Sequence, residues 1–186
     1  PEPDETIIDL ASAPGGKATH IAQLTGDKSR IIACDIHAHR LDLIYQNMQQ
    51  LGINSITPML CDSRRLPDDI RAIRFDKVLL DAPCSGTGVL RRRADLRWRR
   101  TKGDLRKLIT LQKALLESAS CLVKPGGILV YSTCSIEQEE NAELISYFLS
   151  RHPEFSKDHA KPDLPDGFQK AFPEQGQPFV STYPHI

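Results

Sequence analysis

Two cysteines stand where a thiol could act as a nucleophile. Cys84 ends the sequence Asp-Ala-Pro-Cys at 81–84, and Cys134 lies in Ser-Thr-Cys-Ser at 132–135. Each motif follows a short apolar run of the kind that forms a buried strand. Because parallel strands end at the same edge of a sheet, we expect both thiols and the Asp81 carboxylate in one cleft. Such a set of groups can form a covalent adduct and move protons.

These groups fit substitution at C5 of a pyrimidine ring. C5 becomes nucleophilic only after a thiolate adds at C6, and an acid near N3 stabilises the charge that develops during this addition. A base must then remove the C5 proton so that the thiol can leave. Spacing alone leaves the roles of Cys84 and Cys134 interchangeable. Cys134 is also expected near a helix N-terminus, which would lower the pKa of its thiol. The other cysteines, Cys34, Cys61 and Cys121, are expected to be small buried hydrophobes.

A turn with two glycines follows the first predicted strand and indicates a nucleoside-bearing cofactor. It comprises Ala11, Ser12, Ala13, Pro14, Gly15, Gly16 and Lys17. The turn has neither the P-loop spacing nor the three glycines of a dinucleotide fingerprint. Asp35, after the second strand, could accept hydrogen bonds from ribose hydroxyls, and Asp62, after the third, could accept one from an adenine amino group. S-adenosylmethionine fits these residues best, with Lys17 near its carboxylate. The alternative is a turn that only joins a strand to a helix.

The elements that position these residues alternate between strand and helix. We expect strands at about 6–10, 31–34, 56–60, 75–80 and 128–132, and helices from 16 to about 24, 41–51, 104–122 and 135–150. Ser135 and Gln138 have the spacing of a capping box that would begin the last helix. The alternation predicts an α/β fold, a doubly wound and mostly parallel sheet with helices on both faces.

Composition and charge place limits on the function. The 186 residues predict one domain over 1–186, with an irregular part after residue 150 that holds only a possible strand at 179–181. Net charge is zero, yet residues 91–107 carry nine basic and two acidic side chains, a local charge of +7. This stretch, Arg91 to Lys107, is either a polyanion-binding surface or a solvated face. No membrane span, secretion signal or metal motif is found. Five unpaired cysteines predict a reducing, cytoplasmic setting.

Five segments occur in a fixed order along the chain. They are ASAPGGK at 11–17, DIHAHR at 35–40, CDSR at 61–64, DAPCSGTGVLRR at 81–92 and STCSIEQEEN at 132–141. In order and spacing they resemble the motifs of RNA cytosine-C5 methyltransferases, in particular the bacterial Fmu/Sun-type proteins that modify small-subunit ribosomal RNA. The resemblance covers about residues 6–150.

The resemblance implies a Rossmann-like fold and a role for each motif residue. The residues implied to bind S-adenosylmethionine are 11–17, Asp35, Asp62 and Asp81. Asp81 is also implied to touch the target base. Cys134 is implied to be the nucleophile, whereas Cys84 assists release of the methylated product. DNA cytosine-C5 methyltransferases use the cysteine that follows proline instead, so this assignment rests on the resemblance.

The resemblance also implies RNA as the partner, most simply ribosomal RNA held by the basic stretch 91–107. Members of this family usually carry an N-terminal RNA-binding domain, so we expect the chain to be a catalytic-domain fragment. Transfer RNA, DNA cytosine or an exocyclic amine stay open as methyl acceptors. A non-catalytic RNA-binding module on the same fold also stays open.

Overall fold

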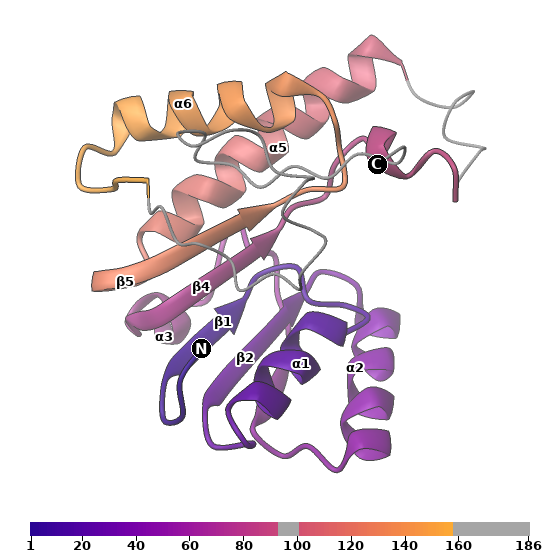
Figure 1. Ribbon diagram of the computed structural model, residues 1–186, viewed down its shortest axis with the longest axis vertical. Helices are drawn as coiled ribbons and strands as arrows, with labels where there is room; N and C mark the ends of the chain where they lie inside the picture. Colours follow the sequence, from indigo (N-terminus) through magenta and orange to yellow (C-terminus); the bar gives the residue numbers. More distant parts are fainter. Residues whose placement is uncertain (93–100, 158–186) are drawn as a thin grey trace, which may run out of the picture. The chain divides into compact units, whose positions relative to one another are not determined.

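The computed structural model describes residues 1–92 and 101–157 (Figure 1). The chain divides into two compact units. The first comprises Pro1–Pro83 and Leu111–Ser132, and the second comprises Cys84–Thr110 and Thr133–Ile186. The expectation of one catalytic domain over 1–186 stays a prediction. The possible strand at 179–181 lies outside the described residues.

The first unit is built on a parallel five-stranded sheet in the order β3-β2-β1-β4-β5. The strands are β1 (Thr6–Asp9), β2 (Arg30–Asp35), β3 (Ile56–Leu60), β4 (Phe75–Asp81) and β5 (Val123–Ser132). Apolar residues, many of them β-branched, fill β1 and β2, as expected for strands buried on both faces. All five predicted strands are confirmed. The chain order reverses at β1, so β1 and β4 frame the switch point at which such sheets bind ligands.

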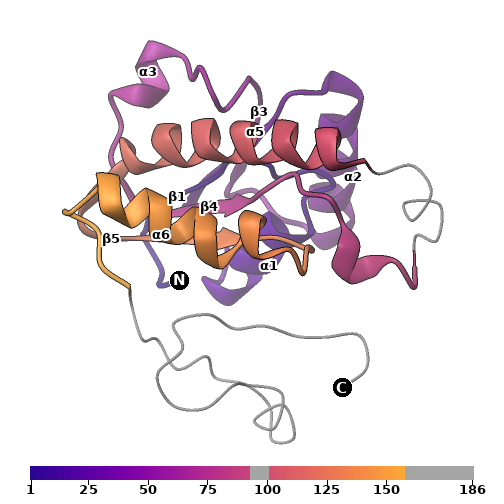
Figure 2. The same cartoon turned by 90° about the horizontal axis from the view of Figure 1, so that it is seen from above.

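Helices cover both faces of this sheet, as predicted. The elements α1 (Gly16–Leu24) and α2 (Ala38–Leu51) share one apolar cluster with the sheet. Its members are Ile7, Ala13, Ala18, Ala22, Ile31, Ala33, Leu41, Ile44, Ile53 and Ile56. Figure 2 shows α1 and α5 (Lys102–Ser120) on opposite sides of β1 and β4, and the part of α5 in the first unit buries Leu115, Leu116 and Ala119. A short α3 (Asp68–Arg71) precedes β4.

Two predicted boundaries are wrong. β5 begins at Val123 and not at 128, because Lys124 to Gly127 form an irregularity within the strand. A Cβ at Gly127 would lie 2.9 Å from the Asp76 carbonyl oxygen, so glycine permits this close approach. The last helix, α6, spans Ala142–Arg151 and is preceded by a 3-10 turn, η2 (Gln138–Glu140). It therefore begins seven residues after Ser135.

The second unit is described over residues 84–92, 101–110 and 133–157. It contains a 3-10 turn, η1 (Thr87–Val89), the first half of α5, η2 and α6. Leu144 and Phe148 form the buried stripe of α6, and Phe148 stacks on His152 with ring centroids 4.5 Å apart. None of the helices in the described ranges is both long and apolar enough to cross a membrane.

Candidate functional site

Four carboxylates follow β1 to β4 at the carboxyl edge of the sheet in the first unit. They are Asp9, Asp35, Asp62 and Asp81. The strand register aligns Asp9 with both Ala33 and Leu79. Side chains alternate along a strand, so Asp9, Asp35 and Asp81 point to one face. This is the face that α1 and α2 cover, which confirms that the sequence motifs after these strands converge on one edge.

The glycine turn lies between β1 and α1 and is held from α2. The Arg40 guanidinium donates to the Ala13 carbonyl at 2.8 Å, and the Asn47 amide donates to the Pro14 carbonyl at 2.8 Å. Gly15 has a φ of 100°, which strongly favours glycine, and a Cβ there would lie 3.2 Å from the Ile44 side chain. These contacts hold the turn at the N-terminus of α1.

Asp9 is a site residue that the sequence reasoning missed, because it lies inside the apolar run 6–10 and not after it. Its side chain is 1% exposed, and Oδ1 accepts a hydrogen bond of 3.3 Å from the Ala11 amide. Asp9 Oδ2 and Ser12 Oγ are both buried and make no hydrogen bond of good geometry within the described ranges, although the Ser12 hydroxyl is near enough to partly offset the rise in the Asp9 pKa. Burial raises the pKa of the Asp9 carboxyl from 3.8 to about 6. Two unsatisfied buried oxygens beside the turn are typical of a site that a ligand completes.

The other carboxylates already have partners. Asp35 is 4% exposed, accepts a hydrogen bond of 2.9 Å from the His37 amide, and lies 3.4 Å from the Arg40 guanidinium. Asp62 forms a forked ion pair with Arg64, which holds the pKa of the Asp62 carboxyl below its usual range. Each of these acids can still accept further hydrogen bonds, because a carboxylate has about four acceptor positions.

Lys17 forms an ion pair with Asp81, the acid that ends β4. The second oxygen of Asp81 accepts a hydrogen bond of 2.8 Å from the Ser132 hydroxyl. The side chains of Lys17 and Asp81 are 53% and 34% exposed, so both remain accessible from solvent. The first unit thus combines buried acceptors, a hydrogen-bonded turn and the accessible cation of Lys17. This donor and acceptor set fits a nucleoside cofactor that carries a cationic centre and a carboxylate.

The two candidate thiols lie together in the second unit. The sulfurs of Cys84 and Cys134 are 3.2 Å apart, and the Cys134 amide donates to Cys84 Sγ at 3.3 Å. Cys134 is exposed, whereas Cys84 is half-buried. Burial and the neighbouring Cys134 thiol both raise the pKa of the Cys84 thiol. The prediction that the thiols meet is therefore confirmed. Asp81 belongs to the first unit, so its place in the same cleft stays a prediction.

Backbone contacts hold the loops that carry the thiols. The Gly88 amide donates to the Cys134 carbonyl at 3.0 Å, and a Cβ at Gly88 would lie 2.9 Å from that oxygen. The Ile136 amide donates to Thr87 Oγ1 at 3.1 Å. The nearest α-helix after Cys134 begins only at Ala142, so the expectation that Cys134 lies at a helix N-terminus was wrong.

The remaining cysteines differ from one another. Cys34 is fully buried in β2, as predicted, whereas Cys61 is only half-buried, which corrects the expectation that it would be buried, because β3 ends at Leu60. Cys121 is exposed, which corrects the expectation that it would be buried. The reason is that α5 ends at Ser120, so Cys121 lies in the following turn and Leu122 takes the buried position. The described ranges contain no cluster of His, Cys, Asp or Glu that could hold a metal ion.

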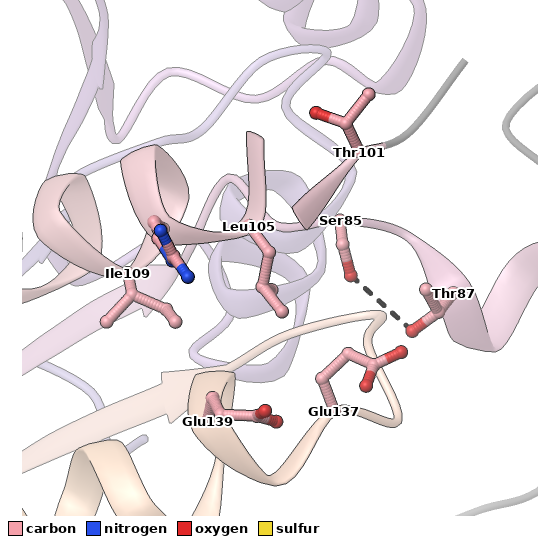
Figure 3. Close-up of a pocket in the computed structure, with 8 residues that line it drawn as sticks. Ser85, Thr87, Thr101, Leu105, Ile109, Glu137 and Glu139 are labelled. Carbon is pink, nitrogen blue, oxygen red and sulfur yellow. Dashed lines mark hydrogen bonds between the residues drawn. The ribbon is translucent and has the colours of Figure 1, made fainter. Parts of the chain in front are cut away.

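A pocket of about 530 Å³ adjoins the residue that follows Cys84 in the second unit (Figure 3). Its lining combines three hydroxyls, an apolar surface from α5 and three charged side chains: Ser85, Thr87, Thr101, Leu105, Arg106, Ile109, Glu137 and Glu139. Arg106 belongs to the basic stretch 91–107. Arg91, Arg92, Arg106 and Lys107 are exposed, and residues 93–100 lie outside the described ranges.

Comparison with known proteins identifies the family. A model described as 16S rRNA methyltransferase RsmB/F matches residues 1–186. The chain belongs to the RsmB/F family of 16S rRNA methyltransferases. It is 39% identical over 180 residues to "Probable ribosomal RNA small subunit methyltransferase B" of Bacillus subtilis, covering 97% of this chain and 39% of that protein. It is 44% identical to "Ribosomal RNA small subunit methyltransferase B" of Sodalis glossinidius, covering 83% of this chain and 35% of that protein.

A solved structure supports the same fold. The crystal structure of NSun6 from Pyrococcus horikoshii with SFG has a TM-score of 0.74 and 40% sequence identity, covering 81% of this chain and 38% of that one. The Rossmann-like methyltransferase fold predicted from the sequence is thereby confirmed. The chain spans less than half the length of these RsmB/F relatives.

Proposed function

We propose that this chain is the catalytic part of an enzyme that transfers a methyl group from S-adenosylmethionine to C5 of a cytosine in small-subunit ribosomal RNA. One observation carries the proposal: two thiols lie 3.2 Å apart on loops that follow β4 and β5. Methyl transfer to oxygen or to an exocyclic nitrogen needs no thiol, whereas C5 of a pyrimidine must first be activated by one. Membership of the RsmB/F family supports RNA as the substrate.

The carboxyl edge of the sheet is the proposed place for the cofactor. When bound, S-adenosylmethionine supplies a methyl group on a positively charged sulfur. The turn 11–17 would hold it by its backbone, and Asp35 and Asp62 would accept hydrogen bonds from its ribose and adenine. Asp9 and Ser12, each with a buried oxygen that makes no well-formed hydrogen bond within the described residues, would complete the site next to the cationic part.

The two thiols have different proposed roles because their surroundings differ. Cys134 is exposed and can reach C6 of a target base, so it is the nucleophile. Cys84 is half-buried, and its raised thiol pKa keeps it protonated. It can therefore donate to the Cys134 sulfur when a base removes the C5 proton and the bond between that sulfur and C6 breaks. Asp81, as an acid near N3, would stabilise the charge that develops as the adduct forms.

The RNA must present the target base outside a stacked helix, since C6 is inaccessible within one. The exposed basic residues Arg91, Arg92, Arg106 and Lys107 are the proposed phosphate contacts. The pocket lined by Ser85 and Leu105 has hydroxyl, apolar and charged surfaces suited to a neighbouring nucleotide. Binding through these contacts should weaken steeply with salt.

The test is a pair of cysteine substitutions in the full-length protein. With S-adenosylmethionine and a small-subunit ribosomal RNA transcript, Cys134→Ser should abolish both 5-methylcytosine and any covalent protein–RNA adduct. Cys84→Ser should instead accumulate an adduct that survives a denaturing gel. Cys121→Ser, which removes an exposed thiol outside both proposed sites, is the matched control and should behave like the wild type.

The opposite pattern, with the adduct in Cys134→Ser, would overturn the assignment of roles. Methyl transfer retained in Cys134→Ala would favour an exocyclic amine as the acceptor. Intact RNA binding without cofactor binding, measured by calorimetry, would favour a non-catalytic RNA-binding module.

A further inference from the structure

A fully buried carboxylate adjoins the thiol pair in the second unit. Glu140, the last residue of η2, is 0% exposed. Its Oε1 accepts a hydrogen bond of 2.9 Å from the Ser85 amide, and its Oε2 accepts one from the Ser85 hydroxyl. Burial of a charged group is costly unless it is hydrogen-bonded, so a carboxylate at this position requires a physical reason.

The reason lies in what these hydrogen bonds join. Ser85 directly follows Cys84, and Glu140 belongs to the loop that carries Cys134. These two donors belong to one residue, so the carboxylate fixes the backbone and the side chain of Ser85 together. The Ser85 hydroxyl also lies 3.0 Å from the Ser135 hydroxyl, next to Cys134. These contacts hold the two loops at the spacing that leaves the sulfurs 3.2 Å apart.

A second residue of the same loop supports this interpretation. The Asn141 side chain donates to the carbonyls of Ser135 and Glu137 at 3.0 and 2.8 Å, and its oxygen accepts from the Thr133 hydroxyl at 2.7 Å. Asn141 thus closes the Cys134 loop on itself. Glu140 is the residue beside it that reaches across to the Cys84 loop, so the two side chains have separate tasks.

We infer that Glu140 is a positioning residue for the release step: it holds Cys84 against the sulfur of Cys134 through Ser85. This inference rests on the proposed function, because release means the breaking of the bond between Cys134 and C6. Glu140 touches neither the base nor the cofactor in this scheme. Its loss should therefore leave adduct formation largely intact and slow only the resolution of the adduct.

The test compares Glu140→Ala, Glu140→Gln and Cys84→Ser in the full-length protein with the RNA transcript and S-adenosylmethionine. Glu140→Ala leaves the Ser85 amide without this buried acceptor, and it should accumulate the denaturation-resistant adduct as Cys84→Ser does, with turnover at least ten-fold lower. Glu140→Gln keeps an acceptor for that amide and should restore most of the turnover. Glu143→Ala, an exposed neighbour in α6, is the control and should match the wild type.

Combining the changes separates a positioning role from general damage to the fold. In a Cys84→Ser background, Glu140→Ala should add no further adduct, because both changes act on one step. If Glu140→Ala does not fold, Ser85→Ala removes only the hydroxyl donor and should raise the adduct fraction several-fold.

Two results divide the outcomes. Suppose that Cys84→Ser accumulates the adduct, but the folded Glu140 and Ser85 variants resolve the adduct at the wild-type rate. This result would overturn the role of Glu140 and leave the proposed function intact. Absence of adduct in Cys84→Ser itself would overturn the proposed function on which that role depends.

Discussion

Replacement of Asp9 by Asn should change how the stability of the protein depends on pH. The carboxyl is 1% exposed, and its pKa is raised from 3.8 to about 6, chiefly by burial. An acid with a raised folded-state pKa stabilises the fold below its unfolded pKa, and this contribution is lost as pH rises through 6. Raising the carboxyl pKa from 3.8 to about 6 lowers the free energy of unfolding at pH 7 by about 3 kcal/mol. Because Asn has no proton to lose, the variant should not pay this penalty.

The assay is urea unfolding of the wild type and the Asn variant from pH 4 to pH 7. Glu5, Asp27, Asp62 and Asp76 have lowered carboxyl pKa values, which destabilise the fold as pH falls, but they are common to both proteins. The difference in unfolding free energy between the two proteins therefore isolates Asp9. It should change by about 2–3 kcal/mol over this range in favour of the variant at pH 7. Parallel pH profiles would refute the reasoning.

Binding of S-adenosylmethionine by the Asp9→Asn variant tests whether Asp9, which destabilises the fold at pH 7, serves to bind the cofactor. If Asp9 faces the cationic part of S-adenosylmethionine, the Asn variant should bind it at least ten-fold more weakly while being more stable without it. Calorimetry at pH 7 measures the affinity. If the variant binds S-adenosylmethionine with wild-type affinity, Asp9 is not part of the cofactor site, and its buried Oδ2 does not contact this ligand.

Two glycine substitutions test the backbone on which each site depends. Gly15→Ala should destabilise the protein by about 1–3 kcal/mol and weaken cofactor binding, because φ is 100° and the new Cβ would lie 3.2 Å from Ile44. Urea unfolding measures the loss of stability, and calorimetry measures the loss of cofactor affinity. Gly88→Ala should lower the rate of adduct formation at least ten-fold, because its Cβ would lie 2.9 Å from the Cys134 carbonyl oxygen and push the thiol loops apart. Gly103→Ala, whose Cβ would make only an ordinary contact with Thr101 at 3.5 Å, is the control for both; equal effects of all three would contradict the steric argument.

The five strands could be predicted because each coincides with a short apolar run in the sequence. Asp35 and Asp81 are acidic residues that end such runs. Because parallel strands have their carboxyl ends at the same edge of the sheet, these residues were expected to lie at that edge. Asp9 escaped the same reasoning only because Leu10 extends the apolar run past it. The ion pair between Lys17 and Asp81 joins residues 64 positions apart, so no local pattern could indicate it.

The start of the last helix was mispredicted for a physical reason. Ser135 and Gln138 have capping-box spacing, but the Ser135 hydroxyl accepts from the Glu137 amide instead, in a local turn. Asn141 takes up the carbonyls that a helix beginning at Ser135 would have used. The polar residues that suggested a cap thus serve the loop of Cys134. The helix start that the local sequence predicted at Ser135 is therefore replaced by the loop that holds Cys134 next to Cys84.

Hydrogen-bond partners distinguish the two most buried acids near these sites. Glu140 accepts from the amide and the hydroxyl of Ser85, a residue of the protein itself, so the fold supplies its carboxylate with partners and its role is to hold two loops together. Asp9 accepts one well-formed hydrogen bond, from the Ala11 amide, and its other buried oxygen has none of good geometry within the described ranges, although the Ser12 hydroxyl lies near. A buried acid that the fold leaves incomplete indicates a ligand, whereas one that the fold completes indicates a positioning role. Substitution of Asp9 should therefore affect cofactor affinity, and substitution of Glu140 should affect the lifetime of the adduct.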